Sequence, residues 1–153
     1  MAAVFVLCAR NGPGGLEVLL GEKLDDRKQD QGLTVPTGHI RGKQERKSRV
    51  FAATRELREE TGIALSHERF LGFRIKGGDY WFWSMLTCEE PRPEPEFDRF
   101  GRAVWGPARF YPIQELPKLP IARWHRKKLL RAVGHLLEEA SVGEIAQIEP
   151  PKT

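Results

Sequence analysis

The 153-residue sequence predicts an α/β fold in which a mixed β-sheet carries helices on its faces. Two observations lead to this prediction: several short β-branched or aromatic runs, and two longer segments with apolar residues at helical spacing. In chain order they give two strands, a polar loop, a helix, a hairpin, a strand and a second helix. A hydrophobic content of 40% over this length suits one domain with a single core.

The chain opens with two apolar, β-branched runs at residues 2–8 and 16–22. Residues 11–15 between them are almost all turn formers, so the two runs are predicted to pair as a hairpin. Residues 23–32 are polar and charged, which indicates a surface loop. Such a loop either borders a substrate or has no specific role.

The first helix is predicted to follow Ser48, which is placed to act as its N-cap, and to stop at Gly62. Val50, Ala53 and Leu57 form an apolar stripe on one face of this helix. That face is expected to pack on the sheet.

Three carboxylates lie on the other side of the same helix, because Glu56, Glu59 and Glu60 stand at i, i+3 and i+4. Like charges at this spacing repel, and a cation among them removes the repulsion. Hard divalent cations such as Mg²⁺ prefer carboxylate oxygens together with substrate phosphates. The alternative is a solvated acidic face paired with Arg55 and Arg58.

The middle of the chain predicts a second hairpin, in which residues 69–76 and 80–88 flank Gly77-Gly78-Asp79. Alternation along the second strand points Tyr80, Phe82 and Ser84 to one face and Trp81, Trp83 and Met85 to the other. Residues 89–96 contain three prolines among four glutamates and are expected to be irregular.

The last part of the chain predicts a short strand at Ala103–Trp105, a proline-punctuated segment at 107–120 and a second helix at 121–140. Leu129, Val133, Leu136 and Leu137 recur at helical spacing in that helix. The predicted domain spans residues 1–140, and residues 141–153 are expected to be a flexible tail.

Residues 55–63 resemble the Nudix box of the Nudix hydrolases, which cleave nucleoside diphosphates linked to another moiety. Arg55-Glu56-Leu57, Glu59-Glu60 and Gly62-Ile63 match that motif at every defined position. The first half departs from it, because six residues separate Gly38 from Glu45 and nine separate Glu45 from Arg55, a net insertion of three. Lys47 stands where the spacing places the motif's glutamate. Either Glu45 reaches the same place from a longer loop, or its contact with Arg55 is missing.

The resemblance implies an α/β/α sandwich over residues 2–140 and a metal-dependent site. Glu56, Glu59 and Glu60, with the carbonyl of Gly38, would hold Mg²⁺ or Mn²⁺, and Arg55 would orient the carboxylates. The cations would offset phosphate charge and activate a water for in-line attack. The family often adds an acid from a later loop; Glu94, Glu96 and Asp98 are the candidates, and Glu96 is favoured.

Tyr80 and Trp83 are the predicted stacking surfaces for the base of a nucleotide. Most aromatic side chains at strand spacing belong to a core, so two of the four in residues 80–83 are expected to be structural. Tyr80 follows Ile63 by seventeen residues, near where the dinucleoside polyphosphate branch of the family tends to carry a tyrosine.

The net charge of +4 is unevenly distributed, because five of the nine residues at 41–49 are basic. Lys43, Arg46 and Lys47 are the predicted contacts to a phosphate chain. The alternative is a solvated loop. RNA is only weakly indicated as a partner, since no recognised RNA-binding motif accompanies these cations.

Several classes are not expected. No apolar run is long enough to span a bilayer, and residues 2–8 lack the basic lead of a signal peptide. Cys8 and Cys88 lie in apolar runs and are expected to be buried, so a cytoplasmic protein is predicted.

The predicted function is a divalent-metal-dependent pyrophosphohydrolase acting on a nucleotide, with nucleoside triphosphates and dinucleoside polyphosphates favoured. The alternative is a non-catalytic Nudix-like module that binds a nucleotide or RNA.

Overall fold

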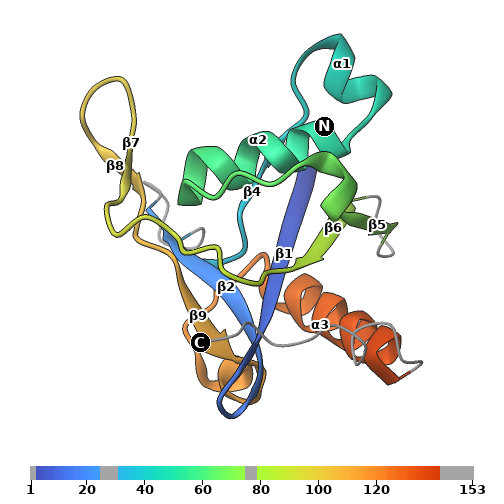
Figure 1. The fold of residues 1–153 in the computed structure, drawn as a ribbon. Coiled ribbons are helices and arrows are strands. Elements are labelled where there is room, and N and C mark those ends of the chain that lie inside the picture. The colour runs from blue at the N-terminus through green and yellow to red at the C-terminus, as the bar shows by residue number, and fades with distance from the viewer. Residues whose placement is uncertain (1–2, 25–30, 75–78, 142–153) are drawn as a thin grey trace.

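The computed structural model describes residues 3–24, 31–74 and 79–141, and these residues form one mixed sheet with helices on both of its faces (Figure 1). The strands are β1 (Ala3–Gly12), β2 (Gly15–Lys23), β3 (Gly32–Thr34), β4 (Thr37–His39), β5 (Leu71–Arg74), β6 (Tyr80–Met85), β7 (Glu96–Phe97), β8 (Ala103–Trp105) and β9 (Arg109–Pro112). The helices are α1 (Gly42–Lys47), α2 (Val50–Thr61) and α3 (Arg126–Ser141), with short 3₁₀ turns η2 (His67–Arg69) and η3 (Ile113–Lys118).

Strand β1 lies inside the sheet, whose order is β5-β6-β1-β2-β8-β7. It pairs in parallel with β6 and antiparallel with β2 and β4, while β3 and β9 both pair with β2. The predicted N-terminal hairpin is confirmed by the register Ala9↔Val18. The sheet is therefore mixed, as the sequence predicts.

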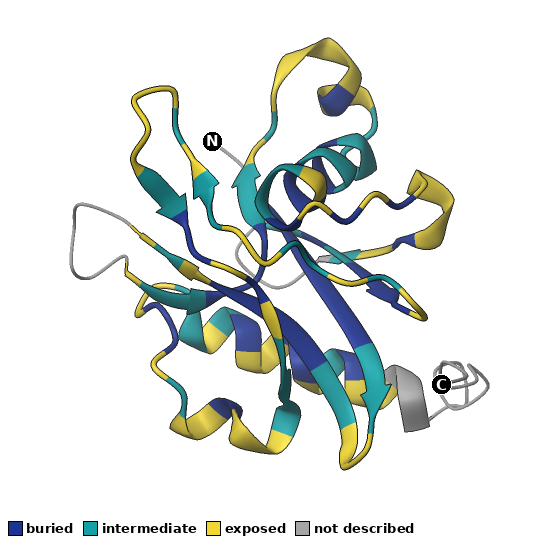
Figure 2. Cartoon of the chain, turned by 60° about the vertical axis from the view of Figure 1, so that its left-hand side comes forward, coloured by how far each residue is buried: buried dark blue, intermediate teal, exposed yellow. Residues whose placement is uncertain are grey.

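Each face of the sheet has its own core (Figure 2). On one face, Ala53 and Leu57 of α2 pack with Val6, Cys8 and Leu19 of the sheet. The other face carries α3, through Leu129, Ala132, Val133 and Leu136, against a core that includes Leu7 and Trp81. This confirms the predicted α/β fold and places α2 above β1.

The second helix is shorter than predicted. It begins at Arg126 rather than residue 121, because Ala122 donates its N–H to the carbonyl of Leu33 and extends the edge of β3 instead. Leu137 is 44% exposed and does not join the core, which corrects its predicted role. No helix among the described residues is long and apolar enough to cross a membrane.

Two local predictions around α2 have different outcomes. Gly62 ends the helix in the left-handed region, with φ of 79°, as predicted. Ser48 does not cap α2, because it closes α1 by donating its N–H to the carbonyl of Gln44, and Arg49 takes the N-cap position. The segment predicted as an inserted loop contains a helix, α1.

The predicted pairing of β5 with β6 is confirmed by the antiparallel register Leu71↔Trp83. Residues 77–78 of its turn lie outside the described residues, as do residues 25–30 of the polar loop and residues 142–153 of the expected tail. Trp81, Trp83 and Met85 are buried on the α3 side, as the alternation predicts. Cys8 is buried, but Cys88 is exposed, so the prediction for Cys88 is wrong.

Candidate active site

The acidic residues of α2 lie against β4, where the chain passes close to the helix. Glu60 accepts a hydrogen bond from the backbone N–H of Thr37 at 3.0 Å. A Cβ on residue 38 would overlap the carboxylate of Glu56, whose side chain is only 5% exposed. A larger residue at position 38 would therefore displace the buried carboxylate of Glu56.

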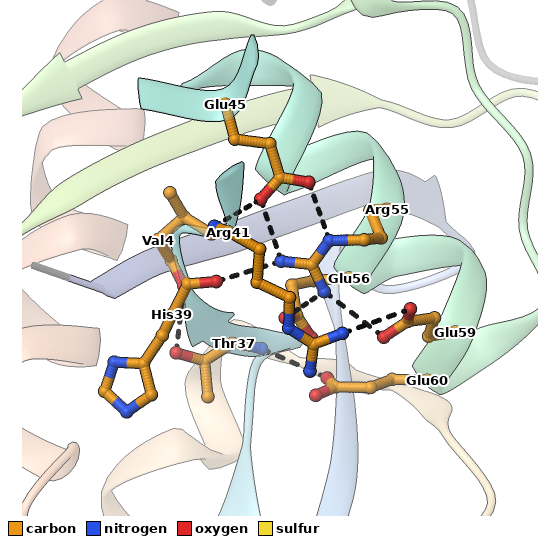
Figure 3. Close-up of polar contacts among 9 residues, drawn as sticks. All are labelled: Val4, Thr37, His39, Arg41, Glu45, Arg55, Glu56, Glu59 and Glu60. Carbon is orange, nitrogen blue, oxygen red and sulfur yellow. Dashed lines mark hydrogen bonds and ion pairs between the residues drawn. The ribbon is translucent and has the colours of Figure 1, made fainter. Parts of the chain in front are cut away.

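The displaced glutamate of the motif reaches Arg55 after all (Figure 3). Glu45 is buried on α1 and receives two hydrogen bonds from Arg55, Nε to Oε2 at 2.7 Å and Nη2 to Oε1 at 3.0 Å. The backbone N–H of Arg41 adds a third at 2.8 Å. These hydrogen bonds, led by those from Arg55, hold the pKa of the Glu45 carboxyl below its usual value. Helix α1 thus absorbs the insertion, and Lys47 is left exposed.

Arg55 connects this helix to the acidic cluster. Its Nη1 donates to Oε1 of Glu56 at 2.7 Å and to Oε2 of Glu59 at 3.3 Å, and its Nη2 donates to the carbonyl of His39 at 2.9 Å. The guanidinium is 14% exposed, so these bonds form in partly dehydrated surroundings. Arg55 therefore orients two carboxylates from a fixed position.

Three of the acids, Glu56, Glu60 and Glu96, have raised pKa values. Burial, followed by repulsion from Glu56, raises the pKa of Glu60 well above its usual value. Burial also raises the pKa of Glu56, against the opposing charge of Arg55. Across the cavity, burial and the charge of Glu59 raise the pKa of Glu96. Four carboxylates share a place in which their negative charges are not fully compensated.

A cavity of about 570 Å³ brings these groups together. Its acidic end is lined by Gly38, Arg41, Glu56, Glu59, Glu60 and Glu96, and its lining also includes Phe5, Asp79, Trp105, His125 and Lys128. A separate hollow of about 640 Å³, lined by residues such as Gly32 and Arg123, contains none of the four acids. The chemistry therefore belongs to the smaller cavity.

The donor chemistry of the acidic end fits a hard divalent cation. Its oxygens come from carboxylates, of which Glu56 and Glu60 have raised pKa values, and a bound cation would relieve the repulsion between the carboxylates. Within the described residues, no three acidic, histidine or cysteine side chains have their donor atoms gathered as they are around a bound metal. Arg55 and Arg41 balance part of the charge of Glu56 and Glu59 instead.

The three candidate loop acids, Glu94, Glu96 and Asp98, lie in different surroundings. Glu96 begins β7, within a segment that was expected to be irregular, and lines the cavity. Glu94 is exposed and does not line it. Asp98 accepts the N–H groups of Phe100 and Arg102 at 2.8 and 2.9 Å, within the turn between β7 and β8. Glu96 is the acid that fits the predicted position.

The predicted base-stacking residues lie elsewhere. Trp83 is 5% exposed within the α3-side core, so its predicted substrate contact is corrected: its strand face is covered by α3. Tyr80 lies beneath the guanidinium of Arg49, 4.0 Å from the ring centre, and does not line the cavity. Lys43, Arg46 and Lys47 are exposed on α1 and do not line it either.

Sequence reasoning missed the part of the cavity lined by Asp79, His125 and Lys128. There Lys128 pairs with Asp79 at 2.5 Å, and Nδ1 of His125 lies 2.7 Å from the hydroxyl of the buried Thr34. His125 and Lys128 stand three residues apart at the start of α3, a spacing that places both on one helix face. That spacing was the available signal, but the sequence alone does not tell whether the shared helix face lies toward solvent or toward a cavity.

Comparison with known proteins identifies the family. The model of the NUDIX domain matches residues 1–133. Solved structures give the same fold: the NUDIX domain of Shewanella oneidensis NrtR complexed with ADP ribose has 18% identity and a TM-score of 0.61, covering 89% of this chain and 88% of that one. A Caenorhabditis elegans Ap4A hydrolase has 19% identity and a TM-score of 0.55, covering 90% and 98%.

A third similar structure is a bifunctional NMN adenylyltransferase/ADP ribose pyrophosphatase from Francisella tularensis, complexed with AMP and a Mn ion. It has 16% identity and a TM-score of 0.60, covering 90% of this chain and 41% of that one. No curated protein sequence matches. The chain belongs to the Nudix family, because the family model covers most of its length. It is accordingly a hydrolase of phosphoric anhydride bonds, the enzyme class that residues 55–63 predicted.

Proposed function

We propose that this protein hydrolyses a diphosphate linkage within a nucleotide and that it depends on a divalent cation, Mg²⁺ or Mn²⁺. The observation that carries the proposal is the pairing of Arg55 with Glu45, which holds Glu56 and Glu59 at one end of the cavity. Glu56, Glu59, Glu60 and the carbonyl of Gly38 are the proposed ligands. When bound, the cation would offset phosphate charge and acidify a water molecule.

The protein's own groups have separate roles in this proposal. Arg55 keeps the carboxylates oriented, and the N–H of Thr37 fixes Glu60. Glu96 faces the same cavity from β7 and accepts the proton of the attacking water at its carboxylate, and its raised pKa makes that carboxylate a stronger base than an ordinary glutamate. In-line attack at phosphorus then forms a new P–O bond to the water oxygen and breaks the P–O bond of the anhydride, so that both products carry phosphate.

A nucleotide is the proposed substrate, with nucleoside triphosphates and dinucleoside polyphosphates favoured. Support comes from the similar structures named for ADP ribose, AMP and Ap4A, and from the cavity lining outside the acidic cluster, which includes Phe5, Trp105, His125 and Lys128. Lys43, Arg46 and Lys47 are proposed to attract the phosphate chain from α1 at longer range. Both cysteines of the chain are free thiols, which supports a reducing, cytoplasmic setting.

The test is a panel of nucleoside triphosphates, dinucleoside polyphosphates and nucleotide sugars, with phosphate release measured in the presence of added pyrophosphatase or phosphatase. We expect turnover of at least one class with Mg²⁺ or Mn²⁺ and none after chelation. Binding without turnover under every metal condition would favour the non-catalytic module. That alternative depended on a missing contact to Arg55, and Glu45 makes that contact.

A further inference from the structure

Arg41 occupies a different place from the other cations of residues 41–49. It is the one among them that lines the acidic end of the cavity. Its Nη1 lies 3.7 Å from Oε1 of Glu59, and its side chain is 66% exposed. Figure 3 shows the guanidinium next to Glu59 and Glu60. This ion pair between Arg41 and Glu59 is long and open to solvent, so it restrains the Arg41 side chain only weakly.

The backbone of Arg41 is held much more firmly than its side chain. Its N–H donates to Glu45 at 2.8 Å, and Glu45 is in turn held by Arg55. The residue is extended, with φ of −121° and ψ of 132°, immediately before α1. The Cα therefore stays beside the cavity while a long cationic side chain is able to turn.

We propose that Arg41 is an exchangeable cation of the active site. In the metal-free protein it balances the charge of Glu59; when a divalent cation takes the carboxylates, Arg41 turns to the phosphate chain of the substrate. This inference rests on the proposed function, because it requires a metal and a phosphorylated substrate in the same cavity. The divalent cation and the Arg41 guanidinium would compete for the carboxylate of Glu59. The guanidinium can instead bind phosphate oxygens through paired hydrogen bonds.

Arg55 does not play this part. It is 14% exposed and donates to three carboxylates and a carbonyl, so turning away would leave buried charges unpaired. Arg58 supplies a matched control, because it is an exposed arginine directly before Glu59 in sequence that does not line the cavity.

The first measurement is the affinity for Mn²⁺ without substrate, by isothermal titration calorimetry. Arg41→Gln is expected to bind Mn²⁺ about two- to fivefold more tightly than the wild type, the size of one exposed ion pair. Arg58→Gln is expected to stay close to the wild type. A wild type that binds no Mn²⁺ would overturn the proposed function itself, and the exchange with it.

The second measurement is the affinity for imidodiphosphate, a non-hydrolysable diphosphate, at saturating Mn²⁺. Arg41→Gln is expected to weaken binding about tenfold or more, since charged hydrogen bonds are lost, and Arg41→Lys to lie between it and the wild type. Arg58→Gln is again the control. The exchange is overturned if Arg41→Gln matches Arg58→Gln in both titrations, or if Mn²⁺ binding tightens while imidodiphosphate binding is unchanged.

Discussion

Glu45 and Arg55 form a two-bond ion pair, with Nε to Oε2 at 2.7 Å and Nη2 to Oε1 at 3.0 Å, across a connection of nine residues, two more than in the family motif. The extra residues are taken up by α1, which presents Glu45 inward and its cations outward. The insertion in the motif therefore does not remove the contact between Glu45 and Arg55.

The first prediction concerns this pair. Glu45→Gln is expected to lower the free energy of unfolding by about 1–3 kcal/mol, because it removes charged hydrogen bonds to a largely buried arginine. Urea denaturation at pH 7 measures the change, and Gln44→Ala, on the exposed side of α1, is the control. Because the folded pKa of Glu45 is lowered, the difference should be full above its usual value of 4.5 and should close as the pH falls below it. A difference independent of pH in that range would contradict the assignment.

The second prediction concerns Gly38. Gly38→Ala is expected to cost about 1–3 kcal/mol of stability, because the new Cβ overlaps the buried carboxylate of Glu56. Turnover should fall as well, since Glu56 has to move. Gly14→Ala is a suitable control, because a Cβ there meets no atom within 4 Å. Thermal melts and initial rates for both variants check this, and equal behaviour of the two would show that Glu56 is not held in place by residue 38.

The third prediction concerns metal and pH. Ionised Glu60 destabilises the metal-free protein, because its folded pKa lies well above its usual value of 4.5. Stability without metal should therefore rise as the pH falls from 7.5 towards about 5. Saturating Mn²⁺ at pH 7.5 should raise the melting temperature, because a ligand at a hundred times its Kd stabilises the folded state by about 2.7 kcal/mol. Glu60→Gln should lose most of the pH slope and much of the metal effect. A wild-type melting temperature that does not change when Mn²⁺ is added would contradict the proposed metal site.

The fourth prediction separates the exposed cations of α1 from Arg41. Replacing Lys43, Arg46 and Lys47 together with Gln is expected to raise KM for substrates with three or more phosphates more than for a nucleotide sugar with two. The effect should shrink with added salt, because exposed charges are screened over about 8–10 Å at physiological ionic strength. Steady-state kinetics at two salt concentrations tests this. Equal changes in KM for both substrate classes would show that these three residues are ordinary solvated surface.

The sequence was sufficient for the elements whose signal is local. The spacing of Glu56, Glu59 and Glu60 predicted their common face, and Gly62 predicted the helix end. Alternation in residues 80–85 predicted which aromatic side chains share a face, but which face lines a cavity depends on α3, forty residues later in the chain. Trp83 was misassigned for that reason.

Other features depended on contacts that no local pattern encodes. Ser48 has the right residue type for an N-cap, but it is the C-cap of α1 and Arg49 takes the N-cap position of α2, so α2 begins without a side-chain cap. Glu45 was left open because spacing alone does not reveal that an insertion folds into a helix. The cavity lining includes residues of β1, β8 and α3, so the cavity exists only after the sheet has formed.

The central claim is that the acidic cluster catalyses cleavage of a phosphoric anhydride rather than only binding a nucleotide. Phosphorus NMR on the best substrate of the panel reports binding and cleavage in one sample. With Mg²⁺, the wild type should convert the anhydride resonances to product, and chelation should stop conversion. Glu59→Gln and Glu60→Gln should be slower by orders of magnitude while remaining folded. Folded variants with near-normal rates, or a wild type that broadens the substrate resonances without converting them, would contradict the account.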